Sequence, residues 1–395
     1  MIVVSELVFS GGAHVPFNAG LLAVIRTAFP LERICFAGAS GYIRELKEQA
    51  DEALAKSIEW REIDLLPADT SYFVRLLREM KTLRTLFRII PEGTTGPFLL
   101  THAKPATLVA LKLLRRLQFR KIKVQFVLHG PLGGVIGRRH CHPIRRFQDM
   151  KTALTILGND NLQYIVLEES LKTVLLKNLP VLEKKVAILP HPLPPNESES
   201  NADNLKAPIQ FGFLGLANKP KGFPVFVKLA QEIVMQSPVQ AEFHAIGRVS
   251  SDGSVVLEME ALATKPGMER LSRRDYINKV HHLHFIILPH EGLGYELKSS
   301  GTLLDALAWA KPLIARRIAL FENMFVKYGD IGYLFTTDLE LKSIVERIIQ
   351  EVDRTRYHQQ VLNIERARSS RTPKALSVDY RKICEKMDDQ NSKNE

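Results

Sequence analysis

The sequence predicts an α/β protein made of two doubly wound, Rossmann-like domains. Short apolar runs with the length of buried strands alternate with amphipathic runs of helical period along most of the chain. This alternation stops at a polar stretch near residues 196–204 and then starts again. Strands that alternate with helices in this way form a parallel sheet with helices on both faces. A chain of 395 residues has room for two such domains.

The first half of the chain carries the elements of one parallel sheet. Apolar runs predict strands at residues 2–9, 33–36, 98–101, 124–128, 164–167 and 186–189. Helical periodicity predicts helices at residues 18–28, 42–55, 72–89, 105–116 and 170–178. Most neighbouring strands are separated by a helix, which is the crossover connection that parallel strands require.

The second half repeats the pattern. We expect strands at residues 209–214, 242–246, 285–288, 313–315 and 332–335. Between and after them we expect helices at residues 223–236, 273–281, 300–309, 322–328 and 339–352. This half therefore predicts a second doubly wound sheet.

The break between the halves defines the expected domains. A proline-rich segment closes the first half, and a polar segment without periodicity follows it. We predict domains at 1–195 and 208–370, a linker at 196–207, and a C-terminal helix and tail at 371–395. Ligands of open parallel sheets bind outside the carboxyl ends of the strands. We therefore expect the two domains to face a cleft, with one substrate on each.

Composition favours a cytoplasmic protein. Hydrophobic content of 45% and charged content of 25% are ordinary for a globular protein. No apolar run approaches the roughly 18 residues of a membrane span, and the N-terminus fits a first strand better than a signal peptide. The three widely spaced cysteines predict neither a disulfide framework nor a metal site.

The net charge of +11 is concentrated in the first half. The predicted helix 72–89 carries basic and apolar residues that we assign to separate faces; the basic ones are Arg75, Arg78, Lys81, Arg84 and Arg88, and the apolar ones are Phe73, Leu76, Met80, Leu83 and Phe87. Such a helix can lie on an anionic membrane surface, or it can be the solvated face of a core-packed helix. We expect no nucleic-acid partner, because aromatic residues are sparse among the basic runs and no nucleic-acid-binding module is recognisable.

A helix start in the second half has the features of a phosphate site. Ser299, Ser300, Gly301 and Thr302 open the predicted helix 300–309. The first turn of a helix has free N–H groups and about half a unit of positive charge, and small residues let a phosphate approach closely. Asp305, one turn further, can accept a hydrogen bond from a hydroxyl beside that phosphate. A sugar nucleotide needs both kinds of group: N–H groups that bind its phosphates and a carboxylate that accepts from a hydroxyl.

A lysine-glycine pair adds a cation to this half. Lys221-Gly222 opens the predicted helix 223–236, and a lysine there can reach phosphate oxygens. Lys219 can share or replace this role. The alternative is that both are surface lysines of a turn.

Two histidines of the first half follow predicted strands. Gly11 and Gly12 mark the turn after the first strand, and His14 projects from that turn. A neutral imidazole there can accept a proton from a hydroxyl near pH 7. His129 ends the strand 124–128 and can hydrogen-bond a sugar hydroxyl or the reacting region. The alternatives are a solvent-exposed turn histidine and a histidine that caps a loop.

In their order along the chain, these motifs resemble the GT-B glycosyltransferases, in particular the large retaining bacterial family of sugar-nucleotide transferases. The matching motifs are Gly11-Gly12, His129-Gly130, Lys221-Gly222 and the segment 300–315 with Asp305. The resemblance implies an acceptor-binding N-terminal domain and a C-terminal domain that binds the nucleotide-diphosphate sugar. It implies that His129 approaches the donor sugar, that Lys221 binds the diphosphate, and that the acidic residue at 305 holds the ribose hydroxyls.

The chain departs from the family pattern at its acidic pair. The family usually has two glutamates separated by seven residues, but here the second is Asp305 and the position of the first is Leu297. Glu296, one residue out of register, is the candidate substitute. In this family the first glutamate helps to place the sugar for a reaction that retains the anomeric configuration. If the enzyme inverts instead, a base in the first domain is required, and His14 is the candidate.

We therefore expect a glycosyltransferase that acts on a glycan or lipid-linked acceptor in the synthesis of a surface polysaccharide. Neither a cofactor nor a metal ion is expected, because Lys221 and the helix start can stabilise the diphosphate and no Asp-x-Asp triplet is present. An acceptor carried on lipid would place the protein at the cytoplasmic face of the membrane. The alternatives are a sugar-nucleotide epimerase or a phosphorylase with the same fold, and a non-catalytic basic protein that binds membranes.

Overall fold

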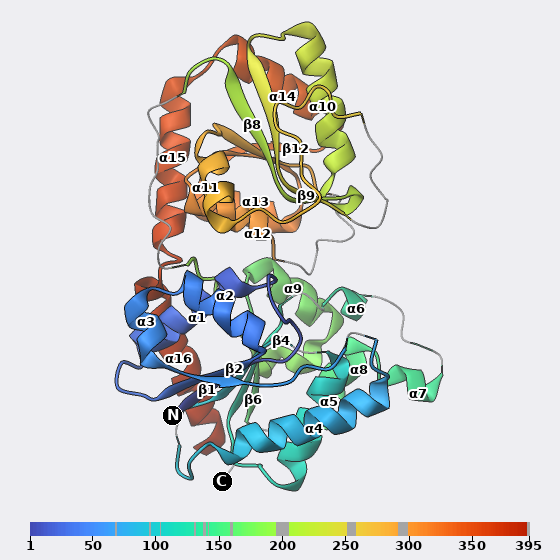
Figure 1. Ribbon diagram of the computed structural model, residues 1–395, viewed down its shortest axis with the longest axis vertical. Helices are drawn as coiled ribbons and strands as arrows, with labels where there is room; N and C mark the ends of the chain where they lie inside the picture. Colours follow the sequence, from blue (N-terminus) through green and yellow to red (C-terminus); the bar gives the residue numbers. More distant parts are fainter. Residues whose placement is uncertain are drawn as a thin grey trace. The chain divides into compact units, whose positions relative to one another are not determined.

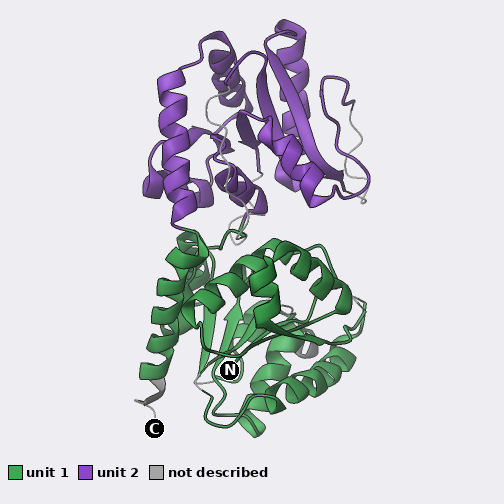
Figure 2. Ribbon diagram, turned by 60° about the vertical axis from the view of Figure 1, so that its left-hand side comes forward, with its two compact units in different colours: residues 1–196, 297–299, 371–395 green, residues 197–296, 300–370 purple. Residues whose placement is uncertain are grey.

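The computed structural model divides the chain into two compact units (Figure 2). Unit 1 comprises Met1–Asn196, Leu297–Ser299 and Arg371–Glu395, and unit 2 comprises Glu197–Glu296 and Ser300–Ser370. The structure describes residues 1–67, 69–94, 96–102, 104–129, 132–136, 140, 142–158, 161–194, 205–250, 258–290 and 299–392. Within these residues, no helix is long and apolar enough to cross a bilayer.

Unit 1 contains a seven-stranded parallel sheet in the order β3-β2-β1-β4-β5-β6-β7. Its strands are β1 (Ile2–Glu6), β2 (Ile34–Gly38), β3 (Ile58–Glu62), β4 (Phe98–His102), β5 (Val124–Val127), β6 (Leu162–Val166) and β7 (Val186–Ile188). The chain winds outward in one direction from β1 and in the other from β4. The carboxyl ends of β1 and β4 are therefore the topological switch point, where doubly wound sheets bind ligands.

Helices cover both faces of this sheet (Figure 1). They are α1 (Val15–Ala28), α2 (Ser40–Gln49), α3 (Glu52–Ser57), α4 (Tyr72–Arg88), α5 (Pro105–Leu117), α6 (Gly133–Ile136), α7 (Pro143–Arg146), α8 (Met150–Thr155), α9 (Glu169–Asn178), the 3₁₀ helix η1 (Pro180–Lys185) and α16 (Pro373–Ser392). The chain returns to unit 1 through α16, which packs against α1. The Tyr380 hydroxyl at its middle donates a 2.8 Å hydrogen bond to Gln125 of β5.

Unit 2 contains a five-stranded parallel sheet in the order β12-β11-β10-β8-β9. Its strands are β8 (Ile209–Ala217), β9 (Ala241–Val249), β10 (Phe285–Leu288), β11 (Leu313–Arg316) and β12 (Gly332–Phe335). Its helices are η2 (Lys219–Lys221), α10 (Phe223–Gln236), α11 (Arg273–His281), α12 (Gly301–Ala308), α13 (Ala319–Tyr328), α14 (Asp338–Gln350) and α15 (Arg354–Ser369). The switch point of this sheet lies between β8 and β10.

The predicted α/β class with two doubly wound sheets is confirmed. One local expectation is wrong, and one strand was missed. The single helix expected at 42–55 is two helices, because the chain is extended at Ala50 and the Asp51 side chain caps α3 by accepting from the Leu54 N–H. The edge strand β3 was not predicted, because most of its residues are partly or fully exposed and lack the apolar run of the central strands.

Candidate functional site

The switch point of unit 2 brings the lysine-glycine turn against the end of β10. Gly222 has a φ of 73°, and a Cβ added there would lie 1.9 Å from the Pro289 carbonyl oxygen. Only glycine fits both this conformation and this close approach. The Asn218 side chain fixes the start of the same turn by accepting from the Lys221 N–H at 3.0 Å. The turn after β8 is therefore held at the carboxyl edge of the sheet.

Lys221 lies beside the first turn of α12. A Cβ added at Gly215 would lie 2.9 Å from the Lys221 Nζ and 3.4 Å from the Thr302 Cγ2, so the ammonium and the helix start flank the same glycine. Burial lowers the pKa of Lys221 to about 8, against the opposing effect of Asp305. Lys219, the other predicted lysine, is exposed on η2. Lys221 is thus the lysine that the fold brings to the predicted phosphate site.

The start of α12 has the predicted small residues in a capped arrangement. Ser300 is the N-cap, and its Oγ accepts from the Leu303 N–H at 3.3 Å and lies 2.9 Å from the Thr302 Oγ1. Gly301 is exposed, and a Cβ added there would meet nothing within 4 Å. Ser299, directly before the cap, is half-buried. There is therefore room beside Gly301 for a larger group.

A histidine missed by the sequence analysis lies beneath this helix start. His290 follows β10, is 1% exposed, and its Nε2 lies 3.4 Å from the Ser300 Oγ. Burial, and then the nearby charge of Lys221, lower the pKa of His290 to about 3. A neutral imidazole at this position supports the N-cap serine without adding a second cation.

Asp305 is held by two side chains of α11. The Tyr276 hydroxyl donates to its Oδ2 at 2.7 Å, and an Arg273 guanidinium nitrogen lies 3.4 Å from its Oδ1. Asp305 remains 21% exposed, and a carboxylate has about four acceptor positions, so it can accept further hydrogen bonds. Arg273 and Tyr276 lie far from Asp305 in the sequence, which gave no sign of this pairing.

The switch point of unit 1 brings His14 and His129 together. His14 is the N-cap of α1 and has a φ of 64°, a left-handed conformation that is uncommon outside glycine. The preceding Gly12 has a φ of 73° and donates its N–H to Glu45 at 2.8 Å. The Nδ1 atoms of His14 and His129 are 2.9 Å apart. These two predicted residues therefore form a hydrogen-bonded pair.

Two further histidines, which the sequence analysis missed, complete a cluster. His102 ends β4 and His191 follows β7, with ring centroids 5.4 Å from His14 and 5.4 Å from His129, respectively. Burial lowers the pKa of His14 and of His102 to about 4 and that of His191 to about 3, and it holds the pKa of His129 well below its usual range. At neutral pH the four imidazoles are uncharged.

A buried carboxyl group lies at the same edge. Glu6 is the last residue of β1, pairs in register with His102, and is fully buried. It accepts hydrogen bonds from the Val8 and Phe9 N–H groups and from the Thr101 hydroxyl. Burial nevertheless raises the pKa of Glu6 to about 7. Through these hydrogen bonds the Glu6 carboxyl group links the turn after β1 to β4.

Other predictions fall outside these contacts. Glu296, Leu297 and Gly130 lie outside the described residues. Among the residues that the structure describes, no group of three or more His, Cys, Asp or Glu side chains is arranged to hold a metal ion. The described motifs thus lie at the carboxyl ends of the strands of each sheet. The structure does not test the first acidic position, at Glu296 or Leu297.

The basic helix differs from its predicted pattern. Arg75 is 4% exposed and pairs with Glu79 at 3.2 Å, so it does not belong to the exposed basic face. Phe73, expected on the apolar face, is 56% exposed, and Leu77 is 68% exposed. The solvent side of α4 therefore mixes apolar and basic side chains.

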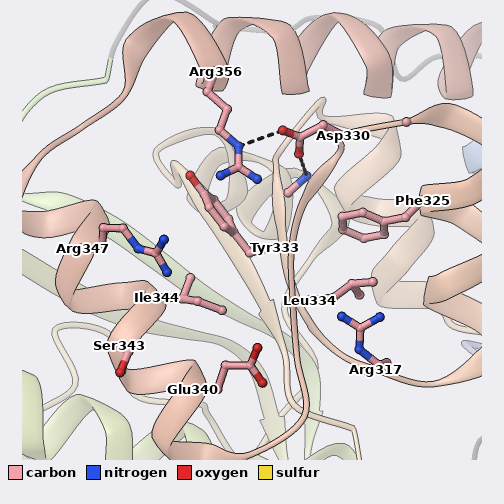
Figure 3. A pocket seen from close by; sticks show the side chains of 12 residues that line it. Arg317, Phe325, Asp330, Tyr333, Leu334, Glu340, Ser343, Ile344, Arg347 and Arg356 are labelled. Carbon is pink, nitrogen blue, oxygen red and sulfur yellow. Dashed lines mark hydrogen bonds and ion pairs between the residues drawn. The ribbon is translucent and has the colours of Figure 1, made fainter.

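A pocket of about 540 Å³ lies elsewhere in unit 2, beside the edge strand β12 (Figure 3). Its walls include Tyr333 of β12 and Arg347 of α14, and Arg356 stacks on the Tyr333 ring at 4.3 Å while pairing with Asp330. None of its lining residues is a predicted site residue. We place the candidate site at the switch point, where the predicted phosphate-binding residues lie.

No protein-family model and no curated protein matches the sequence. Solved structures do match nearly the whole chain. A glycosyltransferase from Rickettsia africae has 10% identity, 98% coverage of both chains and a TM-score of 0.68. WaaG, a glycosyltransferase involved in lipopolysaccharide biosynthesis, has 9% identity, with 97% of this chain and 99% of its own covered and a TM-score of 0.64.

Alr3699/HepE from Anabaena, solved in complex with UDP, has 13% identity to this chain. The match covers 97% of this chain and 98% of that one, with a TM-score of 0.59. At these identities the similarity concerns the fold, and it extends over both units. The chain has the two-domain GT-B fold of these glycosyltransferases.

Proposed function

We propose that this protein is a glycosyltransferase that moves a sugar from a nucleotide-diphosphate sugar to a glycan or lipid-linked acceptor, without a metal ion. One observation carries the proposal: the Lys221 ammonium flanks the open first turn of α12, and Asp305 lies one turn further along the same helix. The fold supports it, since HepE, which shares this fold, was solved with UDP.

The donor diphosphate would bind at the helix start. The N–H groups of Gly301 and Thr302 lie in the first turn and have no partner within the helix, whereas that of Leu303 is used by Ser300. The open space at Gly301 admits a phosphate. As the glycosidic bond breaks, negative charge builds on the diphosphate, and Lys221 with these N–H groups stabilises that charge.

The acceptor would bind unit 1 at the histidine cluster. Neutral imidazoles at the carboxyl edge can exchange hydrogen bonds with sugar hydroxyls. The exposed apolar and basic residues of α4 suit an anionic membrane surface that carries a lipid-linked acceptor. A role in cell-surface polysaccharide synthesis agrees with the involvement of WaaG in lipopolysaccharide biosynthesis.

Binding of nucleotides tests the donor site. Thermal unfolding is measured with UDP, GDP, ADP, CDP and their sugar conjugates; a ligand at about 100 times its Kd stabilises the fold by roughly 2.7 kcal/mol. Calorimetry then compares wild type with Lys221→Ala and Asp305→Ala, using Lys228→Ala as the control because Lys228 is 74% exposed on α10. Unchanged affinity and turnover in both site variants would disprove the assignment.

A further inference from the structure

The pocket of about 540 Å³ beside β12 lies entirely within unit 2, away from the residues of the candidate donor site. We propose that this pocket is a second ligand site. It binds a small organic anion, a phosphorylated or carboxylated molecule with an apolar portion, whose charged group is held by Arg347 and Arg356. This site goes beyond glycosyl transfer and does not depend on it.

The pocket lies over the free edge of β12. Among the described strands, β12 is at the end of its sheet and pairs only with β11. The Arg317 N–H, just after β11, donates to the Phe335 carbonyl oxygen at 2.7 Å, so the backbone groups of Phe335 face β11. Backbone groups alternate in direction along a strand. The N–H and C=O groups of Leu334, which lines the pocket, therefore face the free edge.

Other residues close this edge on both sides of Leu334. The Gly332 carbonyl oxygen accepts from the Gln360 side chain at 3.3 Å, and the Thr336 N–H donates to the Glu340 carboxylate at 2.7 Å. An added peptide strand would need several free backbone groups in a row. Here the opening is one residue long, so the pocket suits a small molecule and not an extended peptide.

Helices on both sides of β12 supply the walls of the pocket. Figure 3 shows Ile344 and Arg347 of α14 on one side of the strand and Phe325 of α13 on the other. Ile344 is 4% exposed, and Phe325 and Leu334 are half-buried, so part of the wall is apolar. Pockets that hold small ligands have volumes of about 300–1,000 Å³. The pocket therefore has the size and the apolar surface for a small organic molecule.

Arg356 is held in place with part of its guanidinium unused. Its Nε donates to the Asp330 Oδ2 at 2.8 Å, and its guanidinium carbon lies 4.3 Å from the centre of the Tyr333 ring. Within the described residues, neither of its terminal nitrogens makes a hydrogen bond. The other oxygen of Asp330 accepts from Gln360 and from the Gly332 N–H. Asp330 thus positions Arg356 and leaves two nitrogens for a ligand.

Arg347 provides a second cation at the same end of the pocket. It is exposed on α14, and its side chain has no ion pair or hydrogen bond with any residue that the structure describes. Figure 3 shows its guanidinium turned toward the Tyr333 ring. Glu340, the acidic residue on the same helix, lies about 10 Å away along α14. Guanidinium groups bind carboxylate and phosphate oxygens in pairs of hydrogen bonds, so the donors here match such an anion.

NMR of the full-length protein labelled with ¹⁵N-leucine locates the ligand. The Leu334 amide signal is identified by its loss in Leu334→Ile. We expect phenyl phosphate and benzoate to shift this signal, inorganic phosphate to shift it less because it has no apolar portion, and neutral phenol to leave it unchanged. The anion that binds more tightly distinguishes phosphate from carboxylate. An equal response to phenol, or no shift with any anion at millimolar concentration, would overturn the proposal.

Calorimetry with phenyl phosphate tests the arginines. Arg347→Gln removes a guanidinium without a protein partner, so the melting temperature should stay as in wild type while the Kd rises about 10- to 150-fold. Arg347→Lys keeps the charge without the planar fork and should fall in between. Arg354→Gln, at an exposed position on α15 outside the pocket, is the control and should leave the Kd unchanged. Equal losses in Arg347→Gln and Arg354→Gln would show only a general attraction of anions and would overturn the site.

UDP separates this site from the donor site in the same labelled protein. The Leu303 N–H lies in the first turn of α12 and reports on the donor site. We expect UDP to shift the Leu303 signal and phenyl phosphate to shift that of Leu334. Phenyl phosphate that shifts Leu303 alone and is displaced by UDP would refute a second site. Binding of phenyl phosphate at Leu334 by a protein that binds no nucleotide would refute the glycosyltransferase proposal and support this site.

Discussion

The Tyr276 hydroxyl donates a 2.7 Å hydrogen bond to the Oδ2 of Asp305 and so joins α11 to α12 beside the candidate donor site. The phenol is largely buried, and burial together with the Asp305 charge holds the pKa of Tyr276 well above its usual range. The Tyr276 hydroxyl therefore stays protonated and remains a hydrogen-bond donor at neutral pH. The carboxylate is thereby held in one orientation before any ligand arrives.

This contact predicts unequal effects of two substitutions on UDP affinity. Asp305→Ala removes a charged hydrogen-bond acceptor, which is worth about 1.5–3 kcal/mol, so the Kd for UDP should rise roughly 10- to 150-fold. Tyr276→Phe only loosens the carboxylate and should raise the Kd less than tenfold. Calorimetry measures both, with Asp338→Asn on the exposed start of α14 as the control. A larger effect from Tyr276→Phe would mean that the phenol itself contacts the ligand.

Two glycines of the candidate site should respond in opposite ways to alanine. At Gly301 an added Cβ meets open space, and alanine is favoured over glycine in helices by up to about 1 kcal/mol. Gly301→Ala should therefore leave the melting temperature unchanged or higher, yet weaken UDP binding because the methyl group occupies the phosphate approach.

At Gly222 the same change affects folding. The added Cβ would lie 1.9 Å from the Pro289 carbonyl oxygen, at a φ of 73°. Gly222→Ala should lower the melting temperature, and any loss of UDP affinity should accompany that shift. Thermal unfolding and calorimetry on both variants separate the two effects. A destabilised Gly301→Ala with normal affinity would contradict the open phosphate approach.

The lowered pKa of Lys221 predicts how UDP affinity depends on pH. The ligand requires the ammonium form, and in the free protein this form is lost as the pH rises through about 8, instead of about 10.5 for an ordinary lysine. Above pH 8 the affinity should fall by up to about tenfold per pH unit, because the binding of one proton is linked to the binding of UDP. Lys221→Arg stays charged and should bind with little change between pH 7 and 9.5. A flat profile in wild type would exclude Lys221 from the diphosphate contact.

The sequence predicted the parts of each site that are local, and missed those that depend on strand order. Lys221-Gly222 and the helix start at 300–302 are visible as short motifs because a turn and an N-cap are built from consecutive residues. His102 adjoins His14 only because β4 lies next to β1, and no local pattern shows which strands are neighbours. A useful signal was still present: His102, His129 and His191 all follow apolar runs that end at the same edge of a parallel sheet.

The membrane interpretation of α4 failed for Arg75 for a related reason. Helical spacing placed Arg75 with Arg78 on the solvent side, but the ion pair with Glu79 lets this arginine be buried. Periodicity alone shows which residues share one face of a helix. It cannot show which of the charged side chains form ion pairs in the folded protein. The exposed residues Phe73 and Leu77 are the ones that a test should address.

Binding to liposomes of anionic lipid tests the exposed side of α4. Leu77→Glu should weaken sedimentation with the liposomes at all salt concentrations, because it removes an apolar side chain that is 68% exposed and adds a negative charge. Arg78→Gln with Arg84→Gln should weaken it mainly at low salt, where surface charges are least screened. Leu31→Glu, at a position 98% exposed in the loop after α1, is the control. Equal binding of all variants would show that α4 is only a solvated face.

The chain returns to unit 1 at a buried ion pair. Arg371 lies directly before α16 and is 1% exposed. Its guanidinium donates to both carboxylate oxygens of Glu168, at 2.8 and 3.0 Å. Removing one partner leaves a buried charge without compensation, so Arg371→Met should destabilise the protein by about 3–5 kcal/mol. Adding Glu168→Gln removes that charge and should recover part of the loss. Urea unfolding of the single and double variants gives the coupling. Additive losses would show that the two side chains stabilise α16 independently.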